Sequence, residues 1–315
     1  MSQAEPENIH QSVLLDECIA ILDARKGGLF VDATLGLGGH SEGILTASAQ
    51  TQVIGIDQDE SALKLASQRL ERFGARFTPF QSNFEAIGKV VGNAEPDGIL
   101  ADLGVSSLQL DSEDRGFSFR FDAPLDMRMD PNSGGETAAE LIGRLDHEEL
   151  ANIIYNYGEE RASRKIARWI IEKRDAGTPI TTTFELAELV RRAVKTNPKD
   201  RTHPATRTFQ ALRIAVNREL DILQQFIFDS VELLKTNGVL AIITFHSLED
   251  RIVKQVFQLL SGKCQCPPRI PQCVCGAAKK VEVLTRKPVV PTDDEMRENS
   301  RSRSAKLRAC RKLEN

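Results

Sequence analysis

The chain has 315 residues, of which 41% are hydrophobic and 27% are charged, a composition typical of a globular protein. This composition excludes a collagen, a coiled coil and a wholly disordered chain. The formal net charge of −4 also excludes a polycation, so any surface for nucleic acid must be a local patch.

The N-terminal residues 1–10 are polar and acidic, without the basic cluster and apolar run of a secretory signal. No stretch of the sequence reaches the roughly 18 apolar residues of a membrane span. We therefore expect a cytoplasmic protein.

Short apolar segments alternate with helical patterns from residue 29 onward. Residues 29–33, 53–57 and 98–102 read as strands that end in polar or glycine-rich turns. Residues 40–49 and 61–73 read as helices between them, the second one behind a serine cap. Repeated strand and helix units predict an α/β fold with a parallel, doubly wound sheet.

A glycine-rich loop follows the first strand and contains Gly36, Gly38 and Gly39. Glycines let the backbone turn sharply and approach a ligand closely, which predicts a loop for a nucleotide-type cofactor. The dinucleotide motif G-x-G-x-x-G would need Gly or Ala at position 41, where the chain has Ser41. A purely structural loop would also tolerate these glycines.

Acidic residues end the second and third predicted strands. Asp57 lies about twenty residues beyond the glycine loop, where a carboxylate can accept both hydrogen bonds of a ribose diol. Asp102 precedes the turn at Gly104, at the carboxyl edge of the sheet, where α/β proteins bind ligands. Alone, such a residue is more often a solvated cap, but together with the glycine loop it favours an adenosine cofactor.

Beyond Asp102 the pattern of the chain changes. Residues 111–135 are rich in Gly, Pro, Asp, Ser and Phe without periodicity, and we interpret them as a substrate-facing loop. A helical block follows and includes a capping box at Thr182 and Glu185. Another helical stretch spans residues 204–235, and residues 239–245 read as a buried strand.

The economical domain organisation is an α/β core in residues 1–109 and 206–315, interrupted by an all-helical insertion in residues 110–205. The insertion and the basic C-terminal tail are dense in Lys and Arg, which can neutralise the phosphates of a nucleic acid. Those of the helical block and its exit are Arg161, Arg164, Lys165, Arg168, Lys173, Arg174, Arg191, Arg192, Lys195, Lys199, Arg201 and Arg207. Those of the tail are Arg286, Lys287, Arg297, Arg301, Arg303, Lys306, Arg308, Arg311 and Lys312. Any single one is more often solvated than in contact, so the prediction concerns the set.

Four cysteines crowd into one short segment: Cys264, Cys266, Cys273 and Cys275. Their C-x-C…C-x-C spacing could close a tetrahedral zinc site, although C-x-x-C would indicate one more strongly. Paired surface thiols or a redox-labile loop remain alternatives, and we assign no metal ligand to the functional site.

Several blocks of sequence form a pattern that is more specific than any one of them. They are His10-Gln-Ser-Val-Leu-Leu-Asp-Glu17, Gly36-Leu-Gly-Gly-His40, Asp102-Leu-Gly-Val-Ser-Ser107, Arg115-Gly-Phe-Ser-Phe119, Pro124-Leu-Asp-Met-Arg-Met-Asp130, His203-Pro-Ala-Thr-Arg-Thr-Phe-Gln210 and Phe245-His-Ser-Leu-Glu-Asp-Arg251. The pattern resembles the bacterial 16S ribosomal RNA (cytosine-N(4))-methyltransferase family. The resemblance implies an S-adenosylmethionine-dependent enzyme on a Rossmann-like class I methyltransferase sheet, in which the helical insertion recognises the substrate.

Residue by residue, the resemblance implies contacts with the cofactor. Gly38, Gly39 and His40 would contact S-adenosylmethionine, and Asp57 would bind its ribose. The implied partner is 16S ribosomal RNA, within the small ribosomal subunit, and no membrane is involved. The oligomeric state stays open, a homodimer included.

The resemblance also implies that Phe84 and Asp102 lie on the adenine side of the cofactor and that Gln109 lines its site. An aromatic face near the cofactor crevice agrees with the position of Phe84, which follows the strand-like residues 77–80. A core phenylalanine would fit that position nearly as well.

The implied reaction methylates the exocyclic N(4) amine of a cytidine, a poor nucleophile that must be aligned with the methyl donor. We predict that Asp102 accepts a hydrogen bond from this amine, with a backbone carbonyl of residues 103–106 as the alternative. His246 and Ser247, after the strand at 239–245, could instead contact the base or a phosphate. Methylation at a ring carbon is disfavoured because the chain has no Pro-Cys pair.

The substrate-facing loop carries Phe117, Phe119 and Phe121, which could stack on a base that leaves its helix or could simply pack beneath the insertion. Two other functions remain compatible with the motifs taken singly. A nucleotide-dependent oxidoreductase would use the same loop and Asp57, and a non-catalytic nucleic-acid-binding regulator would use the basic residues alone.

Overall fold

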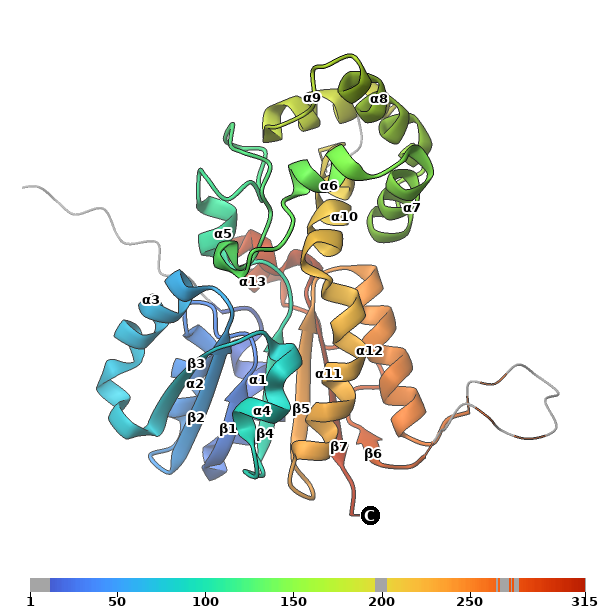
Figure 1. Cartoon of the computed structure of the whole chain (residues 1–315). Coiled ribbons are helices and arrows are strands. Elements are labelled where there is room, and N and C mark those ends of the chain that lie inside the picture. The colour runs from blue at the N-terminus through green and yellow to red at the C-terminus, as the bar shows by residue number, and fades with distance from the viewer. Residues whose placement is uncertain are drawn as a thin grey trace, which may run out of the picture. The chain divides into compact units, whose positions relative to one another are not determined.

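A computed structural model describes residues 12–195, 203–264, 266, 272, 274 and 278–314 (Figure 1). The chain forms two compact units. One comprises Met1–Gly104 and Leu220–Asn315, and the other Val105–Glu219. We call them the sheet unit and the helical unit.

The sheet unit contains a seven-stranded sheet in the order β3-β2-β1-β4-β5-β7-β6. Its strands are β1 (Gly28–Asp32), β2 (Thr51–Asp57), β3 (Phe77–Gln81), β4 (Gly98–Asp102), β5 (Val239–Thr244), β6 (Val281–Val283) and β7 (Lys306–Lys312). The first five strands are parallel, and β7 runs antiparallel to both of its neighbours. The order reverses between β1 and β4, the switch point at which open α/β sheets bind ligands.

Helices cover both faces of this sheet. They are α1 (Leu15–Ile21), α2 (Gly39–Ala47), α3 (Glu60–Leu70), α4 (Ile87–Val91), α11 (Glu219–Leu233) and α12 (Ser247–Leu260). The short helix α13 (Asp293–Glu298) also belongs to the sheet unit. Alternate strand residues point to opposite faces, so Phe30 and Leu100 pack in the core beneath α1 and α2, whereas Val31 and Ile99 pack in the core beneath α11 and α12. Burial on both sides explains why these strands read as continuous apolar runs.

The helical unit has its own hydrophobic core. It contains α5 (Ser107–Asp111), α6 (Ala138–Arg144), α7 (His147–Gly158), α8 (Ser163–Asp175), α9 (Thr183–Ala193) and α10 (Thr206–Asn217), and no strand is assigned within its described residues. Leu150, Ile166 and Leu186, from three successive helices, are fully buried together. The expected capping box of Thr182 and Glu185 is confirmed at the start of α9.

The expected strands of the sheet are confirmed to within two residues at each end, because their apolar runs end where the backbone must turn. The cap of α3 is a correction. The side chain of Asp59, instead of the expected serine, accepts the N–H groups of Ser61 and Ala62.

The helical unit is longer than the expected insertion at 110–205. Its last helix is α10, whose Phe209 and Leu212 pack in the helical core instead of against the sheet. The expected single helical stretch at 204–235 is two helices, since Arg218 takes a left-handed conformation with φ 52° between α10 and α11. The boundary between the units therefore lies at a break in the helical pattern that the composition does not reveal.

Much of the predicted basic tail is part of the sheet. Residues 306–312 form β7, where Lys306 and Arg308 both pair with Asp250 on α12. The ammonium group of Lys312 donates to the carbonyls of Glu232 and Leu234. Asp250 therefore neutralises Lys306 and Arg308, and carbonyl oxygens of the fold hold the Lys312 ammonium group.

None of the helices in the described parts of the chain is long and apolar enough to cross a membrane.

Candidate active site

Three carboxyl groups end three neighbouring strands of the sheet. Asp57 ends β2, Asp32 ends β1 and Asp102 ends β4, and β1 lies between the other two strands. All three therefore stand at the carboxyl edge, on both sides of the point where the strand order reverses.

The loop after β1 is anchored to Asp57. The Gly36 N–H donates to Asp57 Oδ2 at 2.7 Å, and the Asp59 N–H donates to Oδ1 at 2.9 Å. Burial raises the pKa of Asp57 to about 6. Each oxygen of an ionised carboxylate has a further lone pair, so Asp57 can hold the loop and still accept hydrogen bonds from a ligand.

Two glycines shape the end of this loop. Gly38 has φ 79°, in the left-handed region, and is the N-cap of α2 without any side-chain cap. A Cβ on Gly39 would overlap the hydroxyl oxygen of Ser12. Ser12 therefore lies directly against the loop at the start of α2.

Asp32 has a structural role beneath the loop. It is 1% exposed, and the Ser41 hydroxyl donates to its Oδ2 at 2.7 Å. Burial raises its pKa to about 6. Because its partners come from the loop and from α2, this carboxyl fixes the helix start to the strand end.

His40 is buried on α2 and faces Asp102. Its Nε2 lies 2.9 Å from the Val13 carbonyl, which can only accept, so this nitrogen carries the proton. Burial lowers the pKa of His40 to about 4, so the ring is neutral near pH 7. The other nitrogen, Nδ1, is then an unprotonated acceptor 3.8 Å from Asp102 Oδ2, beyond hydrogen-bond distance.

Asp102 has an unmet hydrogen-bonding requirement. Its Oδ1 is buried and has no hydrogen-bond partner among the described residues, while its backbone N–H donates to the Thr34 hydroxyl at 2.6 Å. Burial, with the nearby charges of Asp32 and Glu249, raises its pKa well above the ordinary value. A buried acceptor without a donor is costly, which indicates a site for a ligand that brings a donor or a positive charge.

Phe84 and Gln109 lie in different units. Phe84, in the sheet unit, packs its ring edge-to-face against Phe226, with centroids 5.0 Å apart. Gln109, in the helical unit, forms the capping box of α5 with Ser106: its side-chain oxygen accepts the Ser106 N–H, and its own N–H donates to the Ser106 hydroxyl. Their contacts with a cofactor stay predictions.

His246, predicted as an alternative contact for the base or a phosphate after β5, has a partner within the fold. His246 is the N-cap of α12, and buried Glu249 accepts the N–H groups of Phe245 and His246 at 2.8 and 3.3 Å. The His246 Nε2 lies 3.1 Å from Glu249 Oε1. Glu249 was not anticipated, although H-x-x-E before an apolar run resembles a capping box.

The aromatic residues of the predicted substrate loop pack within the helical unit. Phe117 is 7% exposed, and the Phe119 ring lies 4.5 Å from His203 and 5.0 Å from Phe209, centroid to centroid. Core packing accounts for both phenylalanines.

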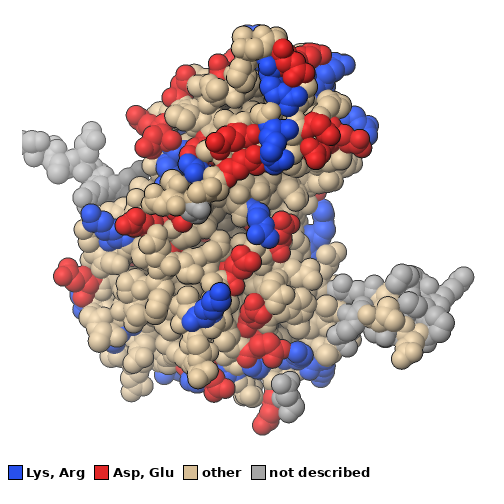
Figure 2. All heavy atoms as spheres, viewed as in Figure 1, with Lys and Arg blue, Asp and Glu red and all other residues tan. Residues whose placement is uncertain are grey.

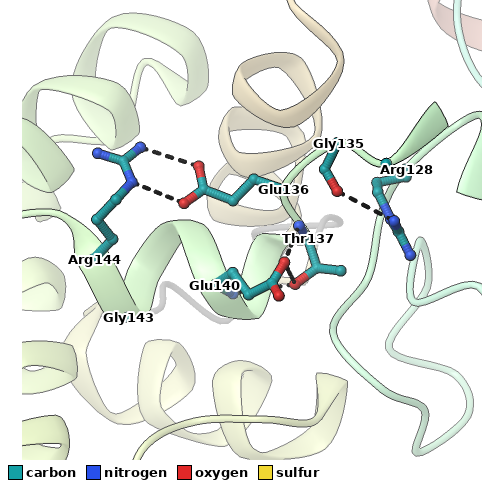
Figure 3. A pocket seen from close by; sticks show the side chains of 8 residues that line it. Arg128, Gly135, Glu136, Thr137, Glu140, Gly143 and Arg144 are labelled. Atoms are coloured by element: carbon teal, nitrogen blue, oxygen red, sulfur yellow. Dashed lines mark hydrogen bonds and ion pairs between the residues drawn. The ribbon is translucent and has the colours of Figure 1, made fainter.

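A surface pocket of the helical unit carries paired charges (Figure 3). Arg144 forms an ion pair with Glu136 at 2.8 Å, and Arg128 donates to the Gly135 carbonyl while pairing with Asp126. The exposed face in Figure 2 likewise interleaves Lys and Arg with Asp and Glu. These charges have partners within the fold, so the pocket offers no ready binding group.

The cysteine cluster falls partly outside the described residues, where Cys273 and Cys275 lie. Within the described residues, the Cys266 N–H lies 3.4 Å from Cys264 Sγ. The zinc hypothesis stays untested.

The sheet order and the glycine loop, with carboxyl groups at three strand ends, form a Rossmann-like cofactor site. Together with the family match that follows, they make the protein a methyltransferase that uses S-adenosylmethionine. The model of the MraW methylase family matches residues 7–313, and the chain belongs to this family. Family membership decides against the oxidoreductase and non-catalytic alternatives.

Curated relatives cover nearly the whole chain. A protein of Carboxydothermus hydrogenoformans is 50% identical over 307 residues, which are 96% of this chain and 98% of the relative. A protein of Clostridium botulinum (strain Kyoto / Type A2) is 50% identical over 308 residues, 96% of this chain and 99% of the relative. Both are named ribosomal RNA small subunit methyltransferase H.

Proposed function

We propose that the protein transfers a methyl group from S-adenosylmethionine to the exocyclic N(4) amine of a cytidine in 16S ribosomal RNA. The observation that carries the proposal is the unpartnered Asp102 Oδ1 at the sheet edge, beside the glycine loop. The naming of the close relatives as small-subunit rRNA methyltransferases supports the choice of substrate.

The charges of the site suit this cofactor. Asp57 is ionised near pH 7, since burial raises its pKa only to about 6, and His40 is neutral because burial lowers its pKa to about 4. A cationic donor therefore meets a carboxylate without an opposing imidazolium, and its positive charge favours the ionised form of Asp102, whose pKa is raised by burial. S-adenosylmethionine, when bound, supplies a methyl group activated by the positive charge of its sulfonium.

Each cofactor residue has a distinct part in the proposal. The backbone at Gly38 and Gly39, with His40, holds the amino-acid portion near the start of α2. The free lone pairs of Asp57 accept the ribose hydroxyls. Phe84 contacts the adenine, and Asp102 and Gln109 complete the lining.

Asp102 is the proposed catalytic residue. A cytosine amine is a weak nucleophile because its lone pair is delocalised into the ring. By accepting an N–H of this amine, the ionised Asp102 Oδ1 would orient the nitrogen and take its proton as the methyl carbon leaves the sulfonium sulfur, which becomes a neutral thioether, and bonds to the nitrogen. Alignment of two reactants can lower a barrier by about 7–11 kcal/mol, so positioning supplies most of the effect.

The RNA would be presented within the small ribosomal subunit, in the cytoplasm. Exposed basic side chains without an acidic partner among the described residues are the first choice for phosphate contacts, and they include Arg161, Arg164, Arg286, Lys287 and Arg303. A homodimer is not required by this scheme, since the proposed cofactor groups all come from one chain.

The test is methyl transfer from tritiated S-adenosylmethionine to small ribosomal subunits isolated from a strain that lacks the enzyme. Mass analysis of nucleosides from the product should show N(4)-methylcytidine at one position. Methylation of another atom would overturn the proposed reaction, and RNA binding without transfer would leave only a binding role.

A further inference from the structure

We infer that Glu295 on α13 is a positioning residue for the cofactor site, acting through Leu14 and Val13 on His40. Its Oε1 accepts the backbone N–H of Leu14 at 2.8 Å, across 281 positions of sequence. The inference rests on the methyl-transfer site proposed above and adds a residue from a remote part of the chain.

The first step is that the Glu295 side chain does not complete the capping box that its sequence position predicts. Five helices in the described parts of the chain begin with a complete capping box, in which the third helical residue returns its side chain to the N-cap N–H. Thr292 and Glu295 have the same spacing, and the Glu295 N–H does donate to the Thr292 hydroxyl at 3.2 Å. The Glu295 carboxylate, however, reaches Leu14, so the local box is left incomplete in favour of a distant contact.

The second step is the conformation of Leu14. This residue has φ 54° and ψ 36°, in the left-handed region that non-glycine residues rarely adopt, and its side chain is 1% exposed. Such a conformation persists only where the surroundings hold it. The buried side chain holds Leu14 on one side, and Glu295 holds its N–H on the other.

The third step links Leu14 to the site. The neighbouring Val13 carbonyl accepts the proton of His40 Nε2 at 2.9 Å, which leaves Nδ1 unprotonated toward Asp102. If the Leu14 N–H were released, the Val13 carbonyl would shift, and the Asp102 carboxyl would draw the histidine proton to Nδ1. Glu295 therefore sets the tautomer and ring position of His40 without touching it.

The test compares variants of the full-length protein by nitrogen NMR of labelled histidine and by calorimetric binding of S-adenosylmethionine. A His40→Asn variant assigns the His40 signals among the five histidines. Wild type should show the Nε2–H tautomer. Glu295→Ala should shift the Nδ1 and Nε2 signals toward the other tautomer and weaken cofactor binding about tenfold, the size expected for one hydrogen bond to a charged group.

Two matched variants separate positioning from general stability. Glu295→Gln keeps an oxygen that can accept the Leu14 N–H and should restore the wild-type tautomer, with binding within about threefold. Glu298→Ala, on the same helix at an exposed position, should change neither reading. If Glu295→Ala fails to fold, Glu295→Asp keeps the charge but shortens the reach and should give a partial shift of the His40 signals.

Unchanged His40 signals and unchanged cofactor affinity in a folded Glu295→Ala or Glu295→Asp protein would overturn the inference and reduce Glu295 to a tether for α13. Both readings are made without RNA. An inactive wild type in the methyl-transfer assay would therefore contradict the proposed function without changing the result of this test.

Discussion

At the scale of single residues, the three carboxyl groups at the strand ends differ in how much of their hydrogen-bond acceptor capacity remains for a ligand. Asp32 is fully buried and bonded to Ser41, so it serves the fold. Asp57 accepts a hydrogen bond from the Gly36 N–H, which uses part of its acceptor capacity. Asp102 keeps one buried oxygen without a donor, and this unmet requirement marks the residue for chemistry.

Asp102→Asn should reduce kcat for methyl transfer by about 100- to 10,000-fold, because an amide cannot take the proton of the amine. The melting temperature should stay the same or rise, since the substitution removes a buried carboxyl whose ionisation burial disfavours. Single-turnover transfer and a thermal melt measure the two effects. Asp23→Asn, at an exposed left-handed position, is the control and should change neither. A large drop in melting temperature would point to a structural role for Asp102.

Cofactor affinity should fall as the pH falls through about 6. Burial raises the Asp57 pKa to about 6, so below that pH the carboxyl is protonated and must lose its proton to accept both ribose hydroxyls. The dissociation constant should then rise by up to about tenfold per pH unit below 6 and stay constant above about 7. Calorimetry between pH 5 and pH 8 measures it. Asp57→Asn should bind more weakly and with a smaller pH dependence, and an equal dependence in both proteins would contradict the assignment.

At the scale of elements, the cofactor loop depends on a segment from another part of the sequence. Residues 12–14 lie against the loop closely enough that Gly39 has no room for a Cβ. The same segment supplies the carbonyl that binds His40. Loop, α1 and α13 thus form one connected arrangement around the start of α2.

Gly39→Ala should destabilise the protein by about 1–3 kcal/mol, the usual cost of overpacking, because the new methyl group overlaps the Ser12 hydroxyl. Ser12→Ala removes that hydroxyl, so the double variant should recover most of the loss. Urea unfolding of the four proteins gives the coupling free energy. Gly88→Ala, in α4 with open space around it, is the matched control and should not destabilise the protein. Additive effects of the two substitutions would contradict direct contact.

At the scale of the whole molecule, the net charge of −4 does not show that some Lys and Arg side chains are paired within the fold and others are not. Many of those that the sequence suggested for RNA are neutralised inside the fold, as Arg308 is by Asp250. Arg286, Lys287 and Arg303 are exposed and have no acidic partner among the described residues, so we expect them to contribute to the electrostatic part of RNA binding.

Replacement of Arg286, Lys287 and Arg303 by Gln should flatten the salt dependence of RNA binding. Each lost phosphate contact lowers the slope of log K against log salt concentration by about 0.7–0.9, so the triple variant should lose about 2 or more. Filter binding to 16S ribosomal RNA at several salt concentrations measures the slope. Lys26, Arg72 and Lys280, replaced by Gln as a set, remove the same charge from exposed ion pairs and should leave the slope unchanged. Equal slopes for all three proteins would exclude these cations from the RNA surface.

Local patterns in the sequence determined much of the fold and part of the site. Strands that are buried on both faces are rich in apolar residues, so β1, β2, β4 and β5 could be predicted from their short apolar runs. A glycine loop after the first strand, with Asp57 and Asp102 at later strand ends, places the cofactor edge because parallel strands share that edge.

Only the tertiary structure decided which charged and hydrogen-bonding side chains already have partners within the fold. The pairing of Lys306 and Arg308 with Asp250, the packing of α10 in the helical core and the link from Glu295 to Leu14 join residues far apart in sequence. Local propensity could not predict them, because Thr292 and Glu295 have the spacing of a simple helix cap. The reason is physical: a hydrogen bond depends on where the fold brings its donor and acceptor, and sequence spacing fixes that distance only within one turn or strand.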